Sequence, residues 1–180
     1  GEEVAATGKQ VITAIVAGYE ALGRASQGMT QHLGRRGFRM VPVIGPIGAA
    51  ATAAKLLALS GEQTTHALGF AANVASGLYQ GFAEGSMEPY YHAGNAAHNG
   101  VMAALTAKNG GVASPLAFEG SHGLFRTFTG STEKSQQVVE GLGKGFAIKD
   151  VSMKPYATPM GNQEVTHLAV TLRQKVNDAS

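Results

Sequence analysis

Apolar residues recur at helical spacing over most of the chain. Between residues 3 and 26 they fall three or four positions apart, which predicts an amphipathic helix. We predict further helices over 47–59, from Ser60 along a stripe that ends at Leu78, over 92–108 and over 133–142. The chain is therefore predicted to be mainly α up to about residue 145, as a helical-bundle domain.

Two of these helices carry recognisable end signals. Ser60 and Gln63 have the spacing of a capping box, in which each side chain binds the other residue's backbone N–H. Asn109, Gly110 and Gly111 follow Lys108 and should stop the fourth helix, because glycine readily adopts the conformation that ends helices.

The pattern changes after residue 145. Apolar positions at Phe146, Ile148, Val151 and Met153 sit among polar ones and favour a strand. A last helix, capped by Asn162, should follow. We predict a helical domain over residues 1–145 and the beginning of an α/β domain over 146–180.

The stretch HAGNAAHNG, residues 92–100, has almost no side-chain bulk. Glycine and alanine let helix axes approach closely, so a buried helix pressed against its neighbours explains this stretch. The aromatic residues Tyr90 and Tyr91 just before it would then form one wall of a pocket.

Composition narrows the class of protein. Lys and Arg number 14 and Asp and Glu 12, an excess of 14 − 12 = 2, which is too small to indicate nucleic acid or a membrane surface as partner. Charged residues make up only 14% of the chain, which indicates a large contact with another protein or with a further part of the same one. There is no cysteine, no apolar run of membrane-spanning length and no signal-peptide pattern, so we expect a cytoplasmic protein with residues preceding Gly1.

Five segments together resemble the MmgE/PrpD family, which includes 2-methylcitrate dehydratase, cis-aconitate decarboxylase and iminodisuccinate epimerase. They are VAGYE (16–20), GAAATAAKLLALSGEQTTHALGFAANVASGL (48–78), EGSMEPYYHAGNAAHNGVMAALTA (84–107), GLFRTF (123–128) and VSMKPYA (151–157). The resemblance implies a homodimer whose helical domain and smaller α/β lid enclose the active site. It also implies small di- and tricarboxylate substrates, without a metal or organic cofactor. An Asp-rich helix and a His-Pro motif lie upstream of the matching segments in that family, and most of the lid lies downstream.

The resemblance assigns two catalytic candidates. Lys154, in MKPY, matches the family's lysine at the mouth of the lid and would bind a substrate carboxylate. His92 matches the histidine before the small-residue helix and would donate a hydrogen bond to an anion near that helix N-terminus. A solvated lysine and a structural histidine are the alternatives.

Arg39 and Tyr156 are the substrate-binding candidates. Arg39 would hold a carboxylate at two points, and Tyr156 would line the same pocket or simply pack. The other histidines share no metal-site spacing with acidic residues and are interpreted as structural or exposed. They are His32, His66, His98, His122 and His167.

Three positions depart from the family pattern. Arg39 stands where relatives carry histidine, Pro89 where they carry lysine, and Pro159 near where they carry Cys-Arg or His. The first expectation is still a cofactor-independent lyase that dehydrates or decarboxylates a small polycarboxylate by proton transfer α to a carboxylate. An isomerase or epimerase on the same scaffold, or a non-catalytic relative, are the alternatives.

Overall fold

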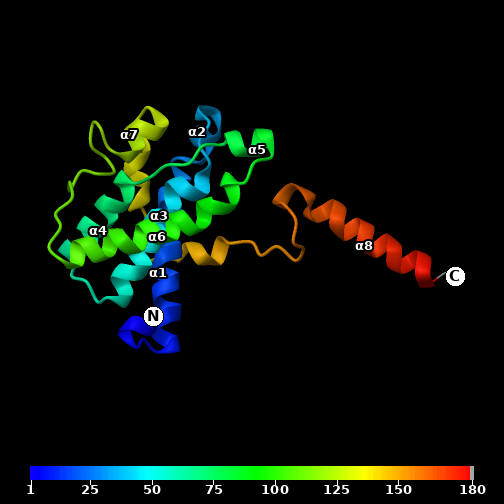
Figure 1. The fold of residues 1–180 in the computed structure, drawn as a ribbon, viewed down its shortest axis with the longest axis horizontal. Coiled ribbons are helices and arrows are strands. Elements are labelled where there is room, and N and C mark those ends of the chain that lie inside the picture. Colours follow the sequence, from blue (N-terminus) through cyan, green and yellow to red (C-terminus); the bar gives the residue numbers. More distant parts are fainter. Residues whose placement is uncertain (179–180) are drawn as a thin grey trace. The chain divides into compact units, whose positions relative to one another are not determined.

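The computed structural model describes residues 1–178 and is built from helices (Figure 1). The α-helices are α1 (Gly8–Gln27), α2 (Thr30–Leu33), α3 (Met40–Leu56), α4 (Gly61–Asn73), α5 (Gln80–Glu84), α6 (Glu88–Lys108), α7 (Leu124–Thr129) and α8 (Gln163–Asp178). The predicted mainly α fold is confirmed. Internal contacts divide the chain into a helical unit, residues 1–148, and a second unit that begins at Lys149.

Helix α3 lies at the centre of the helical unit, with α1 and α6 packed along it and α4 against α6 (Figure 1). The first helix begins at Gly8, later than predicted, because Thr7 caps it. The Thr7 hydroxyl accepts from the Gln10 N–H, and the Gln10 side chain accepts from the Thr7 N–H.

Two prolines do not prevent α3 from starting at Met40, well before the predicted start at residue 47. Pro42 lies in the first turn, where a backbone N–H has no partner inside the helix. Pro46 lies further in and lacks the N–H that would reach the Pro42 carbonyl. That carbonyl accepts from the Ser76 N–H instead, at 3.4 Å, and so ties the chain after α4 to α3.

The small residues of α6 allow the close packing that the sequence predicts. A Cβ added at Gly100 would lie 2.5 Å from the Pro46 carbonyl oxygen and 2.4 Å from the Ala49 Cβ. Gly18 of α1 faces Gly48 of α3 in the same way, with the Gly48 oxygen 2.8 Å from a Cβ built on Gly18. The helix pairs α1–α3 and α3–α6 therefore meet through their backbones.

The predicted end signals of α4 and α6 are present. Ser60 and Gln63 form the capping box of α4, and Gly110 follows α6 with a φ of 88°. Helix α4, which follows Ser60, ends at Asn73 and so does not extend to Leu78, where the predicted apolar stripe ended. Helix α6 starts at Glu88 rather than at His92, because Pro89 fits the first turn of a helix.

The strand predicted around residues 146–153 is not present. Residues 147–150 form a 3-10 turn, and 151–154 run without regular structure. A strand needs a neighbouring strand to satisfy its backbone groups, and none lies within residues 1–178. The helix predicted over 133–142 is likewise only a 3-10 helix, Glu133–Val138. The assignment of residues 146–180 to a lid stays a prediction.

Among the described residues, no helix combines the length and apolar character needed to cross a bilayer.

Candidate functional site

Two short segments of the helical unit pair and place Arg39. Arg39 donates its backbone N–H to the Gly77 carbonyl at 3.1 Å, and Tyr79 donates to the Gly37 carbonyl at 2.8 Å. Gly77 has a φ of 102°, and a Cβ there would fall 2.2 Å from Pro42. A glycine is therefore required for this pairing, which sets Arg39 at the N-cap of α3.

The Arg39 side chain is held on three sides although it is only partly buried. Its Nη1 donates to the Pro89 carbonyl at 2.7 Å and lies 3.4 Å from Nδ1 of His92. Its guanidinium carbon lies 4.6 Å from the centre of the Phe82 ring, as in a cation–π contact. Nε and Nη2 make no hydrogen bond to the described residues, so one edge of the guanidinium remains available to a ligand.

His92 lies in the second turn of α6 and is only 8% exposed. The structure thus brings two of the predicted site residues, Arg39 and His92, into contact across 53 positions of sequence. It also joins Arg39 to Pro89, so two of the positions expected to depart from the family pattern touch each other.

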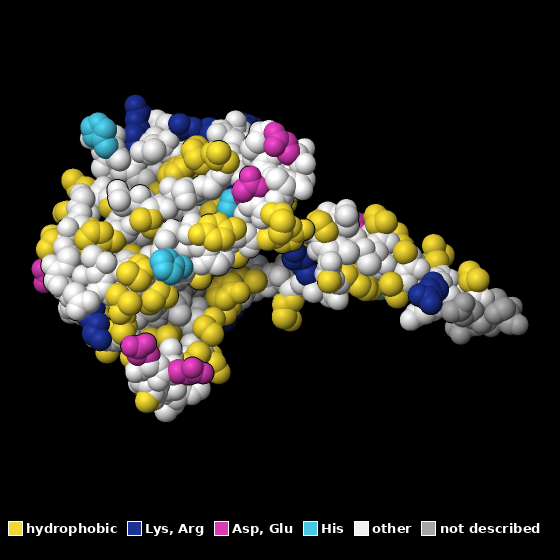
Figure 2. All heavy atoms as spheres, in the orientation of Figure 1, with side chains coloured by type: hydrophobic (Ala, Val, Ile, Leu, Met, Phe, Trp, Pro, Cys, Tyr) yellow, Lys and Arg dark blue, Asp and Glu magenta, His cyan; other side chains and the backbone are white. Residues whose placement is uncertain are grey.

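The aromatic residues beside this pair point outwards. Tyr90 and Tyr91 are 84% and 68% exposed, and Phe82 on α5 is 47% exposed. The predicted aromatic wall is therefore an open surface of the helical unit. Figure 2 shows hydrophobic side chains recurring over the visible face of this unit, with few lysines or arginines among them.

A carboxylate, that of Glu88, lies one helical turn before His92 on α6. The pKa of the Glu88 carboxyl lies below its ordinary value, first because Ser86 hydrogen-bonds to it, then because of the backbone N–H of Glu88 itself, and also through the charge of His92. Glu88 sits one helical turn before His92, so the two side chains share a face of α6.

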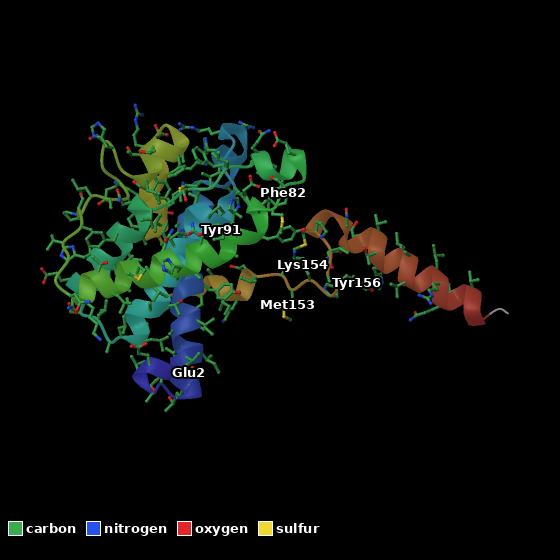
Figure 3. All side chains as sticks on the ribbon, in the orientation of Figure 1. Glu2, Phe82, Tyr91, Met153, Lys154 and Tyr156 are labelled. Carbon is green, nitrogen blue, oxygen red and sulfur yellow. The ribbon has the colours of Figure 1, made fainter. Side chains whose placement is uncertain are left out.

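Lys154 and Tyr156 belong to the second unit (Figure 3). Lys154 is exposed, and no ion pair or hydrogen bond joins its side chain to the side chains described, those of residues 1–176. The Tyr156 hydroxyl lies 2.9 Å from Nδ1 of His167, and Gln163 holds the Tyr156 backbone on both its N–H and its carbonyl. Tyr156 is thus positioned by α8.

Two hollows of the helical unit lie away from Arg39 and His92. The larger, about 760 Å³, is bordered by the end of α4, the loop 113–123 and α7. A smaller one, about 400 Å³, lies between the start of α1 and the end of α3. Neither is lined by any of the four predicted site residues. The described residues hold no cluster of side chains suited to a metal ion.

Two partners in these contacts were not predicted. Phe82 supports Arg39 from a distant part of the chain, and no local pattern marks that contact. His167 is exposed, as interpreted from the sequence, and its contact with the Tyr156 hydroxyl was not foreseen.

The fold and site define an all-helical domain that presents a cation and an imidazole together. The family model described as the MmgE/PrpD N-terminal domain matches residues 1–137. The chain belongs to the MmgE/PrpD family, as the resemblance indicated.

The chain is also similar to curated fungal proteins. It is 36% identical over 158 residues to "Cis-aconitate decarboxylase-like protein oryM" of Aspergillus oryzae, covering 84% of this chain and 33% of that protein. It is 34% identical over 161 residues to "Cis-aconitate decarboxylase" of Aspergillus terreus, covering 84% of this chain and 32% of that protein. The chain thus spans about a third of the length of these relatives.

Proposed function

We propose that this chain forms part of a cofactor-independent lyase that acts on a small di- or tricarboxylate, by decarboxylation or dehydration. The observation that carries this proposal is the contact of Arg39 with His92, 3.4 Å between Nη1 and Nδ1, in a domain of this family. The names of the two fungal relatives favour decarboxylation of cis-aconitate as the first reaction to test.

The residues suit this chemistry. In a decarboxylation the bond from carbon to the leaving carboxylate breaks, its electron pair stays with the substrate, and a proton then replaces carbon dioxide. Fixed cations and hydrogen-bond donors stabilise the negative charge of substrate and transition state. Arg39 and Lys154 would supply the cations, His92 a donor, and Tyr156 a further contact to substrate.

Two of the three departures from the family pattern, at Arg39 and Pro89, lie in contact and keep a cation beside α6. Pro89 removes a lysine side chain that relatives place there, but the Arg39 guanidinium binds the Pro89 carbonyl at 2.7 Å. A positive charge is therefore kept at the first turn of α6. The free edge of this guanidinium has the geometry to hold a carboxylate at two points.

Titration calorimetry of the full chain with cis-aconitate, citrate and shorter dicarboxylates tests this proposal. Arg39→Met should weaken binding of the preferred acid about tenfold or more, since a charge-assisted hydrogen bond contributes about 1.5–3 kcal/mol. Arg35→Met is the matched control, because Arg35 is an exposed arginine a few residues earlier. Equal affinities for wild type and Arg39→Met would remove Arg39 from the site.

The same samples separate the alternatives. Release of carbon dioxide or water supports the lyase. Exchange of an α-proton for deuterium without either product would instead indicate an isomerase or epimerase. Binding without turnover would indicate the non-catalytic relative that the changes at Arg39, Pro89 and Pro159 allow.

We further propose that the protein is a homodimer, as the resemblance implies. The low charge content and the exposed apolar side chains of α5 and α6 support this. Sedimentation of the full chain should give twice the mass of one chain, and a monomer at micromolar concentration would contradict it.

A further inference from the structure

The imidazole of His92 has different surroundings at its two nitrogens. Nδ1 faces the Arg39 guanidinium, with Nη1 at 3.4 Å. Nε2 faces the segment after α4, where a Cβ built on Gly77 would lie 3.6 Å away. Nε2 has no hydrogen-bond partner among the described residues. Every fully buried side-chain nitrogen or oxygen of the described residues does have a partner. Nε2 is therefore not fully buried, although His92 as a whole is only 8% exposed.

The two ring nitrogens of His92 differ in the hydrogen bonds that they can make. A guanidinium has five N–H donors and no acceptor, and it keeps its charge at any ordinary pH. A hydrogen on Nδ1 would point directly at one of those donors. The contact is favourable only when Nδ1 is the acceptor, and a neutral imidazole then carries its hydrogen on Nε2.

The guanidinium is not free to turn away from Nδ1. The same Nη1 donates to the Pro89 carbonyl, which is in α6 like His92. The Phe82 ring lies on one face of the guanidinium, and the Arg39 backbone is bound to Gly77. Three contacts from α5, α6 and the chain after α4 therefore hold the donor in place.

We propose that Arg39 is a positioning residue for His92: it fixes the Nε2–H tautomer, so that His92 offers a hydrogen-bond donor outwards and cannot accept a proton at Nε2 while neutral. The identity of the recipient, a substrate carboxylate, rests on the proposed function. The tautomer itself does not, because it follows from contacts of the ligand-free protein. His92 is thereby assigned as a donor to the substrate and not as the general base.

Nuclear magnetic resonance of the full chain with ¹⁵N-labelled histidine tests the tautomer without any substrate. Long-range ¹H–¹⁵N spectra show which ring nitrogen carries hydrogen, and the signals lost in His92→Gln identify the residue. Wild type should show hydrogen on Nε2 of His92, with a preference on the order of tenfold. Arg39→Met, which keeps length but removes every donor, should reduce that preference and shift the Nδ1 signal.

Two controls isolate the contact. Arg35→Met removes the same charge from an exposed site and should leave the His92 signals in place. Glu88→Gln removes the carboxylate that shares a face of α6 with His92 and should also preserve the tautomer.

Hydrogen on Nδ1 in the wild-type spectrum would overturn the proposal, even if Arg39→Met failed to fold. Unchanged His92 signals in a folded Arg39→Met protein would overturn it as well. Failure of carboxylate binding would reject the proposed function and leave the tautomer assignment standing.

Discussion

At the scale of single residues, Glu20 and Arg24 form a network that fastens the end of the helical unit to α1. Glu20 accepts the Ala147 N–H at 2.6 Å and pairs with Arg24. Arg24 donates from Nη1 to the Val138 and Glu140 carbonyls at 2.9 and 2.8 Å. Both side chains are 13% exposed, so these contacts are largely shielded from water.

This network predicts a pH dependence. The pKa of Glu20 lies below its ordinary 4.5, first because of the Ala147 N–H and then because of Arg24. A lowered pKa in the folded state means that Glu20 stabilises the fold fully above the unfolded value, and that this contribution is lost as pH falls through the folded value. Glu20→Gln should lower the free energy of unfolding by about 1–2 kcal/mol at pH 7.

Chemical denaturation of both proteins between pH 7 and pH 3 measures this effect. The difference between wild type and Glu20→Gln should shrink as the solution becomes acidic. Glu119→Gln, an exposed glutamate, should show little difference at any pH. A constant difference for Glu20→Gln would contradict the role of its charge.

Individual residues show how much of the candidate site could be predicted from the sequence. The sequence selected Arg39 and His92 separately, and the structure brings them together. Their contact depends on the pairing of residues 37–39 with 77–79, a long-range event that leaves no local pattern. Lys154 and Tyr156 were selected by resemblance alone, and their roles stay proposals.

At the scale of elements, the close approach of α3 and α6 depends on small residues. Gly100→Ala would place a methyl group 2.5 Å from the Pro46 oxygen and 2.8 Å from the Ala50 nitrogen, both rigid backbone atoms. We expect a loss of about 1–3 kcal/mol of unfolding free energy, as for other overpacked cores.

Gly94→Ala on the same helix is the matched control. A Cβ there meets nothing within 4 Å, so the gain in helix propensity should stabilise the protein by about 1 kcal/mol. Thermal unfolding of the two variants should give midpoints on opposite sides of wild type. A higher midpoint for Gly100→Ala would show that the two helices are not in backbone contact.

Elements were predictable where local chemistry decides them. The Ser60 capping box and the Gly110 stop were read directly from neighbouring residues. The start of α3 at Met40 was missed, because no local pattern shows that the Ser76 N–H takes the Pro42 carbonyl that Pro46 cannot reach. The strand at 146–153 was predicted from alternation, but alternation alone provides no pairing partner.

At the scale of the whole molecule, the buried apolar side chains all lie between Ala14 and Phe128 of the described residues. The helical unit should therefore fold without the residues from Lys149 on. A chain that ends at Ile148 should unfold cooperatively with a thermal midpoint close to that of the 180-residue chain, measured by circular dichroism. A non-cooperative transition would show that the second unit contributes to the core.

The central claim is that this family member converts a small polycarboxylate with the help of cationic side chains. The most direct test follows cis-aconitate and related acids by ¹H NMR with the full-length protein, its Lys154→Ala variant and Lys149→Ala as an exposed control. We expect loss of carbon dioxide or water with wild type and Lys149→Ala, and a loss of at least about 100-fold in rate with Lys154→Ala. Turnover at the wild-type rate in Lys154→Ala, or no turnover of any acid by folded wild type, would contradict the account.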